Sequence, residues 1–365
     1  MIRLAMIGCG QISERFFVQA EALEGVEFVA TCAKHIESAE AKAHEHGISL
    51  WYDDYEQMMD EVKPDGVVVT TPHSVHAEPA IAALTRGIHV LDEKPMATSL
   101  ADCRVMVDAG DANDAILMCL PFDHTPAFQT ALKYINEATI GKFTGGESLL
   151  IIPGPYRDNW YMNKEVAQGG AMLDCVVYPM SRIVSMLGPA KRVTAMVNNL
   201  IPHRICGNGK QCESDVDDNV TLIVEWAGGQ QVVVRTLWGT SFWRNDTTVY
   251  GRKGTVWFTG DRAIVHSPEK TISEGEPINW QGFDNCYSIS ASSEFPDECM
   301  IGHFTKCIRD HKEPKCSGHL QLHVHEILFK GYVSAETGTT QELVTAFTPW
   351  NLIDPVFYNT RDSWI

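Results

Sequence analysis

The sequence has no long apolar run. Within its 365 residues, no segment approaches the roughly 20 consecutive apolar residues that a helix needs to cross a bilayer. A secretory signal pattern is missing as well, because residues 2–7 already have the apolar composition of a first buried strand. We therefore expect a cytoplasmic location and no membrane partner.

Basic residues are scarce. Lys and Arg number 29 against 47 Asp and Glu, which gives a formal net charge of -18. Nucleic acids and anionic membranes bind basic surfaces, so this balance disfavours both as partners. An anionic small molecule would have to be attracted by local groups, since the overall field of the protein repels it.

Closely spaced cysteines are rare too. The 11 cysteines are scattered singly, and five fall in apolar segments, where a cysteine is typically a small buried residue: Cys9, Cys32, Cys103, Cys119 and Cys175. Only Cys206 and Cys212 lie close together in a polar loop. A disulfide or half of a metal site is an alternative there, but two free thiols are favoured because no nearby pair completes a ligand set. We expect no metal site.

The first part of the chain alternates between apolar strands and helices. Strands are predicted at residues 2–8, 26–32, 66–71, 88–91 and 115–120, with helices at 12–23, 36–47, 55–62, 77–86 and 99–112. This alternation predicts a parallel sheet with right-handed crossovers, an α/β Rossmann domain at residues 1–122.

The pattern changes after residue 122. Extended segments at 144–152, 192–198, 220–226, 230–238, 247–250 and 255–258 have few helices between them, and Ala227-Gly228-Gly229 is typical of a hairpin turn. Helices are predicted at 126–138, 172–187, 298–310 and 320–337. We predict an α+β second domain, residues 123–365, with a large, mostly antiparallel sheet.

A glycine turn follows the first predicted strand, where residues 8–12 read GCGQI. Gly8 permits a tight turn, and Gly10 lets the backbone approach a pyrophosphate at the N-terminus of the next helix. Ser13 stands where the usual dinucleotide-binding pattern has a third glycine, and it is still small enough for close packing. The turn predicts a cofactor site that includes Gly8, Gly10, Gln11 and Ile12.

Other residues suited to a cofactor also follow predicted strands, namely Lys34, Thr71 and Lys94. Ligands bind outside the carboxyl ends of parallel strands, so these residues and Gly8 should converge. The acid that would bind the ribose of NAD is missing after the second strand, where Lys34 stands instead. Two interpretations of Lys34 are equally weighted: a contact to the 2'-phosphate of NADP, and a solvated lysine on a turn.

A second motif lies at residues 169–178. Gly169 and Gly170 allow tight packing as the chain enters the predicted helix 172–187. Asp174 and Tyr178 are four residues apart, so they are neighbours on one side of that helix.

These motifs resemble the Gfo/Idh/MocA oxidoreductase family, which includes glucose-fructose oxidoreductase and inositol dehydrogenase, over nearly the whole chain. The most specific elements are Glu93-Lys94-Pro95 and Gly169-Gly170 through Asp174 to position 178. The less specific ones are the early glycine pair, Thr71-Pro72 with His76, Asp217-Asp218, and Tyr250-Gly251 with Gly254-Thr255.

The resemblance implies a Rossmann domain followed by an open-faced sheet that is often used in dimer contacts. It implies that Lys94 contacts both nicotinamide and substrate, that Lys94–Pro95 is cis, and that Asp174 and position 178 lie in the substrate site. Most relatives have histidine at 178. Tyr178 instead matches the branch with dihydrodiol dehydrogenase and glucose-fructose oxidoreductase and departs from inositol dehydrogenase. In that branch a basic residue near Lys34 goes with NADP.

The remaining site predictions complete this scheme. For the cofactor they are Gly8, Gly10, Gln11, Ile12, Lys34, Thr71, His73, His76, Glu93 and Lys94. For the substrate they are Asp123, His124, Tyr156, Arg157 and Trp160, of which Trp160 has a ring suited to stacking on a sugar.

Hydride transfer from an alcohol needs a group that accepts the hydroxyl proton. A tyrosine has an ordinary pKa of about 10, so it needs a nearby cation to act at neutral pH. We predict that Tyr178 and Lys94 share this role and that Asp174 orients the substrate hydroxyls or Lys94. The structural alternatives are a packing role for Tyr178 and a surface ion pair between Lys94 and Glu93.

The predicted function is an NAD(P)-dependent dehydrogenase or reductase, with NADP preferred, acting on a sugar, polyol or related diol as a homodimer or dimer of dimers. The main alternative is a nucleotide- or sugar-sensing binding protein that kept the fold without turnover. A cofactor-retaining glycoside cleavage is a third and weaker candidate.

Overall fold

A computed structural model describes residues 1–121, 125–155, 160–205, 209–260, 262–273, 275–290 and 299–350. The chain divides into two compact units. Unit 1 comprises Met1–Phe122, Glu165–Gln168 and Glu298–His325, and unit 2 comprises Asp123–Lys164, Gly169–Asp297 and Glu326–Ile365. The sequence prediction assigned everything after residue 122 to the second domain. A late segment instead returns to unit 1, because Ile301, Phe304 and Ile308 belong to the apolar core of that unit.

Unit 1 contains a six-stranded parallel sheet with the order β3-β2-β1-β4-β5-β6. The strands are β1 Ile2–Ile7, β2 Val26–Cys32, β3 Trp51–Tyr52, β4 Gly66–Val69, β5 His89–Asp92 and β6 Leu117–Cys119. This confirms the predicted Rossmann domain. The order reverses between β1 and β4, which is the point where such sheets bind dinucleotides. The sequence pattern missed β3, since two residues are too few to show a period.

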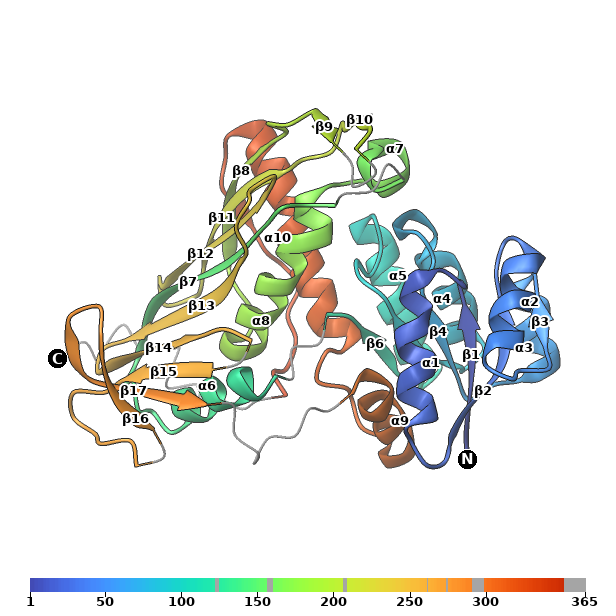
Figure 1. Cartoon of the computed structure of the whole chain (residues 1–365), viewed down its shortest axis with the longest axis horizontal. Coiled ribbons are helices and arrows are strands. Elements are labelled where there is room, and N and C mark those ends of the chain that lie inside the picture. Colours follow the sequence, from blue (N-terminus) through green and yellow to red (C-terminus); the bar gives the residue numbers. More distant parts are fainter. Residues whose placement is uncertain are drawn as a thin grey trace. The chain divides into compact units, whose positions relative to one another are not determined.

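Helices cover both faces of this sheet (Figure 1). They are α1 Glu14–Glu21, α2 Ile36–Glu45, α3 Tyr55–Val62, α4 Ala77–Thr85, α5 Leu100–Ala112 and α9 Met300–Asp310, with the start of α10, Gly318–Thr337. Short 3-10 turns, η1 Gln11–Ser13 and η2 His73–Val75, precede α1 and α4. Although α9 comes late in the chain, it lies beside α1, and the Ile301 amide donates to Gln19 Oε1 at 3.2 Å.

Unit 2 contains a ten-stranded sheet with the order β16-β17-β15-β14-β13-β7-β12-β11-β8-β18. Its strands are β7 Phe143–Ile152, β8 Arg192–Asn198, β11 Asn219–Glu225, β12 Gln231–Trp238, β13 Arg244–Gly251, β14 Gly254–Phe258, β15 Arg262–His266, β16 Glu276–Trp280, β17 Phe283–Ser290 and β18 Gln341–Glu342. Only β7 and β12 pair in parallel. The predicted, mostly antiparallel sheet is therefore confirmed, and the hairpin predicted at Ala227-Gly228-Gly229 joins β11 to β12.

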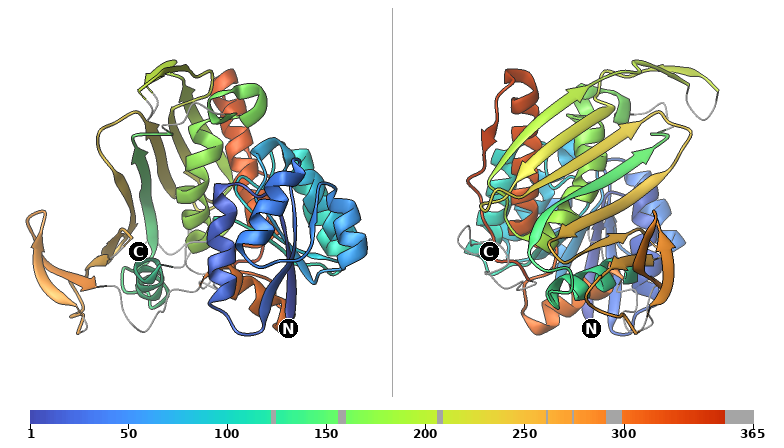
Figure 2. Two further views of the ribbon diagram at one scale, coloured as in Figure 1. Left: turned by 45° about the vertical axis from the view of Figure 1, so that its right-hand side comes forward. Right: turned by 90° about the vertical axis from the view of Figure 1, so that its left-hand side faces the viewer.

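Helices lie on one face of this sheet within unit 2. They are α6 Pro126–Asn136, α8 Val177–Leu187 and the later turns of α10. At Gly331 of α10 the backbone comes so close to Leu222 and Met172 that an added Cβ would lie 3.1 Å from each. Among the described residues no helix covers the opposite face, which Figure 2 shows turned toward the viewer on its right side.

The two short strands β9 His203–Ile205 and β10 Gln211–Glu213 form a separate hairpin. Cys212 on β10 is disulfide-bonded, so the expectation of a free thiol at this position is wrong. Cys206 lies outside the described residues.

One helical stretch has the length and mean composition of a membrane span, although charged residues interrupt its apolar sequence. It is Lys164–Leu187, with 24 residues and a mean hydropathy of 1.2 in its most apolar window. Of that window, 83% is buried inside the protein, as in the core helix of a soluble protein.

Candidate active site

The glycine turn after β1 has the geometry that a dinucleotide requires. Gly8 has φ +99°, and a Cβ there would lie 2.7 Å from the carbonyl carbon of Thr70, so only glycine fits. A Cβ at Gly10 would meet nothing within 4 Å, which leaves its side of the turn open. Ser13 is buried and donates to Gly10 O at 2.7 Å. These residues fit a pyrophosphate at the start of α1, beside the exposed Gln11 and Ile12.

The loops after β1, β2, β4 and β5 lie at one edge of the sheet in unit 1, because these neighbouring strands run parallel (Figure 1). Gly8, Lys34, Thr71 and Lys94 therefore share that edge, as the alternation of strands and helices predicted. Lys34 is exposed directly after β2. Thr71 donates its hydroxyl to Val75 O at 3.0 Å.

Lys94 stands on a turn that backbone and side-chain bonds hold in place. The Lys94–Pro95 bond is cis, as the family resemblance implied. Glu93 forms an ion pair with Arg15 of α1, and its Oε2 accepts the Lys94 amide at 2.9 Å. The Glu93 amide in turn donates to Val69 O at 3.0 Å. The Glu93 carboxylate thus ties this turn to the helix that follows the glycine turn, and Lys94 is half-buried.

The two histidines between β4 and α4 are buried, with His73 2% and His76 1% exposed. Their rings meet nearly edge to face, with centroids 6.0 Å apart. His76 Nε2 lies 2.7 Å from Thr71 O, and its Nδ1 lies 2.8 Å from Pro95 O. Their contact with a cofactor stays a prediction, and both ring nitrogens of His76 already bind the loops of unit 1.

Asp92, which lies directly before this turn, was not among the predicted site residues. It is fully buried at the end of β5, and its Oδ1 lies 3.6 Å from Nδ1 of His76. Burial, together with the neighbouring Glu93, raises the pKa of Asp92 well above its usual range. The sequence did indicate a buried acid here, because Asp92 directly follows the apolar residues Val90 and Leu91. A buried aspartate is rarely found without a partner.

In unit 2, the residues of the second motif lie on a helix with an irregular start. Met172–Val176 forms a π-helical turn that leads into α8. Such turns are rare and often mark functional sites, and nothing in the sequence pattern indicated one here. Tyr178 is 36% exposed and Asp174 half-buried, whereas most residues of α8 are buried. Ser181, also on α8, is buried.

Asp217 fixes the entry to this helix. Its carboxylate accepts the amides of Gly170 at 2.9 Å and Met172 at 2.7 Å, and the hydroxyl of Tyr332 at 2.6 Å. The neighbouring Asp218 is buried and forms an ion pair with Arg204 at 2.6 Å. Both acids of the Asp217-Asp218 motif are therefore structural, the first at the helix start.

The predicted substrate residues are described only in part. Trp160 stacks on Tyr161 with ring centroids 4.0 Å apart. The other four, Asp123, His124, Tyr156 and Arg157, lie outside the described residues. Lys94 belongs to unit 1, and Asp174 and Tyr178 belong to unit 2, so their meeting stays a prediction.

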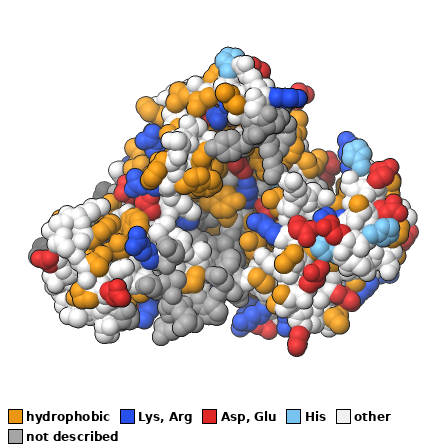
Figure 3. Space-filling view, in the orientation of Figure 1, with side chains coloured by type: hydrophobic (Ala, Val, Ile, Leu, Met, Phe, Trp, Pro, Cys, Tyr) orange, Lys and Arg blue, Asp and Glu red, His pale blue; other side chains and the backbone are white. Residues whose placement is uncertain are grey.

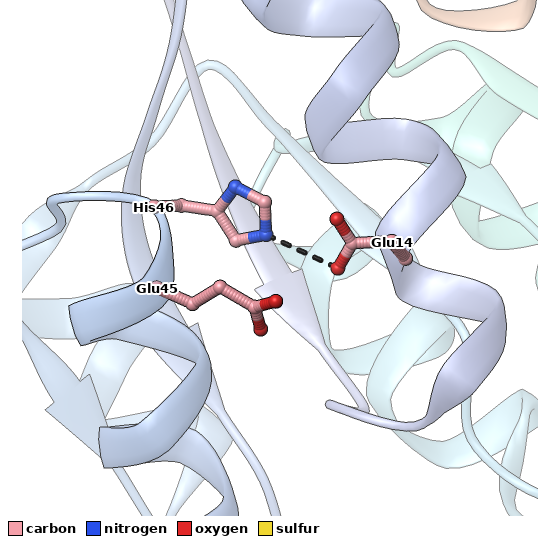
Figure 4. Close-up of side chains that lie close together, drawn as sticks. All are labelled: Glu14, Glu45 and His46. Atoms are coloured by element: carbon pink, nitrogen blue, oxygen red, sulfur yellow. Dashed lines mark hydrogen bonds and ion pairs between the residues drawn. The ribbon is translucent and has the colours of Figure 1, made fainter.

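One cluster in the described part of the chain has the composition of a metal site: Glu14, Glu45 and His46 (Figure 4). Lys42 donates to Glu14 at 2.8 Å and to Glu45 at 2.6 Å, and it lowers the pKa of Glu14. His46 bonds Glu21 at 2.7 Å. The lysine ammonium already supplies the positive charge, so we interpret the cluster as an ion-pair network between α1 and α2.

Two family profiles match the chain. Residues 2–120 match the profile described as "Oxidoreductase family, NAD-binding Rossmann fold", and residues 128–257 match the GFO/IDH/MocA C-terminal domain. The chain belongs to the Gfo/Idh/MocA oxidoreductase family. It is thus an NAD(P)-dependent oxidoreductase, in agreement with the glycine turn and the strand order of unit 1.

Curated relatives cover most of the chain. The scyllo-inositol 2-dehydrogenase (NADP(+)) of Bacillus subtilis is 26% identical over 74% of this chain and 78% of its own length. The trans-1,2-dihydrobenzene-1,2-diol dehydrogenase of Xenopus laevis is 26% identical over 80% and 87%. Among solved structures, levoglucosan dehydrogenase in complex with NADH has a TM-score of 0.83 at 20% identity, covering 94% of this chain and 99% of that one.

Proposed function

We propose that this oxidoreductase prefers NADP and acts on a hydroxyl or carbonyl carbon of a sugar, polyol or related diol. The names of its relatives support this class, because they include a scyllo-inositol dehydrogenase, a levoglucosan dehydrogenase and a dihydrobenzene diol dehydrogenase. All these compounds carry hydroxyl groups on a ring. The departure from inositol dehydrogenase at Tyr178 does not remove polyols from this class.

The observation that carries the proposal is the accessibility of Tyr178 and Asp174 on an otherwise buried helix. A phenol and a carboxylate that stay accessible on a buried helix contribute little to packing, so a binding site is the better explanation for them. In the proposed mechanism Tyr178 accepts the proton of the substrate hydroxyl, and Lys94 supplies the positive charge that favours the phenolate. Asp174 orients the substrate by accepting hydrogen bonds from its hydroxyls. The bound nicotinamide supplies the hydride acceptor or donor.

The preference for NADP rests on Lys34. This residue is exposed directly after β2, where an enzyme selective for NAD places an acid that binds the ribose hydroxyls. A lysine there favours the 2'-phosphate instead, by charge and by hydrogen bonding. The strongly negative net charge of the chain makes such a local cation more important.

The open face of the sheet supports a homo-oligomer. Ile223 on β11 and Val233 on β12 pair across the strands and are 44% and 38% exposed, and Met196 on β8 lies nearby. Figure 3 shows further hydrophobic side chains gathered over strands β13 to β17. An exposed apolar surface of this kind is typical of an interface. We propose a second copy of the chain as its partner, in a homodimer or a dimer of dimers.

One assay tests the reaction. The absorbance of the reduced cofactor is followed while aldoses, polyols and cyclic diols are screened with NAD and NADP separately. Turnover with a member of these classes and a higher kcat/KM for NADP is the expected result. Tight cofactor binding without turnover on any of them would favour the sensing protein. The cytoplasmic location and the absence of nucleic-acid partners stay predictions from charge and composition.

A further inference from the structure

A single imidazole joins two loops at the cofactor edge of unit 1. His76 Nε2 lies 2.7 Å from Thr71 O in the loop after β4, and Nδ1 lies 2.8 Å from Pro95 O in the turn after β5. Backbone carbonyl oxygens only accept hydrogen bonds, so both ring nitrogens have to donate. A neutral imidazole carries one N–H, and the contacts of His76 therefore call for an imidazolium.

Asp92 is placed to balance that charge. Both of its carboxylate oxygens are buried without a hydrogen-bond partner in the described part of the chain, and Oδ1 lies 3.6 Å from Nδ1 of His76. Glu93 is the other acid facing Asp92, and the thiols of Cys103 and Cys119 also face it. A buried carboxylate with no bonded partner is costly, and an adjacent imidazolium offsets that cost.

The location of one proton decides the charge state of this pair. Burial raises the pKa of Asp92 and lowers the pKa of His76, so burial alone favours the neutral form of each group. The pair has zero net charge whether the proton sits on Asp92 or on His76. If Asp92 kept it, one nitrogen lone pair of His76 would point at a carbonyl oxygen less than 3 Å away. The two carbonyl groups therefore favour the proton on the ring. Besides Glu93, Lys94 and His325 are the charged or titratable groups that interact with the His76 ring.

A second histidine holds the other side of the same turn in the opposite state. The Met96 amide donates to His325 Nε2 at 2.9 Å, and His325 Nδ1 donates to Gln321 O at 2.7 Å. This pattern needs a neutral ring with its proton on Nδ1. Burial lowers the pKa of His325 to about 4, in agreement with that state.

We propose that His76 is a positioning residue whose imidazolium, with Asp92 as counter-ion, holds Thr71 and Pro95 together and so fixes the turn that presents Lys94. The arrangement lies within unit 1 and needs no cofactor. Only its consequence for turnover rests on the proposed function. His76 thereby acts behind the cofactor site, through the backbone of the loops that form it.

Nuclear magnetic resonance tests the charge state without any assay of activity. The full-length protein is labelled with 15N in histidine, and two-bond 1H–15N spectra are recorded at pH 7 and 8. The His76 signal is assigned as the one missing in His76→Gln. We expect both ring nitrogens of His76 to show the shifts of protonated nitrogen at both pH values. A neutral pattern, with one protonated and one bare nitrogen, would overturn the proposal.

Asp92→Asn tests the role of the counter-ion. The amide keeps the shape of the carboxylate but not its charge, so the His76 signal should change to the neutral pattern. With a substrate found by the screen, kcat should fall by about 10- to 100-fold, because small displacements of a reacting group are costly, while the Kd of NADP changes less than about twofold. Asp108→Asn, an exposed change on α5, is the control. An unchanged kcat together with an unchanged His76 signal would refute the proposal.

The two readouts separate this inference from the proposed function. If wild-type protein turns over no substrate, the proposed function fails, while the state of His76 is still measured. If Asp92→Asn does not fold, the spectra of the wild-type protein alone decide the charge state.

Discussion

The backbone of Gly170 lies directly against that of Asp217. The amide of Gly170 donates to the Asp217 carboxylate at 2.9 Å, and a Cβ at position 170 would lie 2.0 Å from the Asp217 carbonyl oxygen. No side chain fits into that space, so this contact fixes how the chain enters the helix that carries Asp174.

We expect Gly170→Ala to lower the free energy of unfolding by about 2 kcal/mol or more, because the new methyl group has to displace backbone atoms. Thermal unfolding followed by circular dichroism measures the effect. Gly260→Ala is the matched control, since a Cβ at position 260 meets nothing within 4 Å. Equal melting temperatures for the two variants would contradict the packing argument.

Much of the fold could be predicted from local patterns. The predicted α3 and β8 have the bounds that the structure shows, and the glycine turn lies where the sequence indicated. These features depend on residues close in sequence, whose periodicity and turn chemistry are visible without the fold. The placement of α9 beside α1 was missed, because it depends on contacts between residues about 280 positions apart.

The buried polar network was also missed, for a related reason. His76 and Asp92 are 16 positions apart and on different elements, and only the parallel pairing of β4 with β5 brings their loops together. His76 was assigned to the cofactor site together with the neighbouring Thr71-Pro72 element. The pattern could not show that both of its nitrogens are used within the protein.

Lys34→Asp should change the cofactor preference. The lysine is exposed after β2, and an acid there would repel the 2'-phosphate of NADP and could accept the ribose hydroxyls of NAD. We expect the ratio of kcat/KM for NADP to that for NAD to fall by about tenfold or more, the size expected for loss of a charged hydrogen bond. Lys34→Ala should lower kcat/KM for NADP and leave kcat/KM for NAD unchanged. An unchanged ratio in the aspartate variant would remove Lys34 from the cofactor site.

Val233→Lys tests the proposed interface on the open sheet. The residue pairs with Ile223 on the uncovered face, and a buried lysine ammonium without a partner would be costly in a dimer contact. We expect the variant to sediment as a single chain where the wild-type protein is dimeric or larger. Val18→Lys is the control, because Val18 is 54% exposed on α1 of unit 1. Wild-type assembly in Val233→Lys would place the interface elsewhere.

The stability of unit 1 should depend on pH through His319. Its Nδ1 lies 3.3 Å from Glu313 Oε1, and its Nε2 lies 3.1 Å from Asp111 Oδ2. The hydrogen bond with Glu313 raises the pKa of His319 and lowers that of Glu313. A raised histidine pKa gives stability that is fully present below the unfolded value of about 6.5 and is lost as pH rises through the folded value.

The contribution of Glu313 has the opposite sign. Its lowered pKa gives stability that is present above the unfolded value of about 4.3 and is lost as pH falls through the folded value. Urea unfolding at pH 5.5 and 8.5 should therefore show a loss at the higher pH that His319→Gln abolishes. We expect this loss in the free energy of unfolding to be less than about 1 kcal/mol, since the His319 side chain is 42% exposed and solvent screens the pair. His35→Gln is the control and should keep the pH dependence of the wild-type protein. If His319→Gln kept it as well, the pair of His319 and Glu313 would be excluded as its source.

Lys94→Ala should abolish turnover and change the Kd of the cofactor only modestly. The proposed role of Lys94 is to assist proton transfer through the positive charge that favours the Tyr178 phenolate, and removal of such a group typically costs about 10²- to 10⁴-fold in rate. The turn itself should remain, because bonds of Glu93, Pro95 and Met96 also hold it in place. Stopped-flow absorbance with saturating NADP measures the rate, and cofactor fluorescence measures the affinity.

Tyr178→Phe, alone and combined with Lys94→Ala, tests whether Tyr178 and Lys94 act together in proton transfer. If the phenol accepts the proton and the ammonium assists it, the double variant should be no slower than the slower of the two single variants, since groups that act as a unit are not additive. Lys270→Ala, a change on the surface of unit 2, controls for general loss of charge. A rate near that of the wild-type protein in Lys94→Ala would refute the role of the lysine. Additive losses in the double variant would mean that the lysine and the tyrosine act independently, and that the helix of unit 2 and the turn of unit 1 do not serve the same proton.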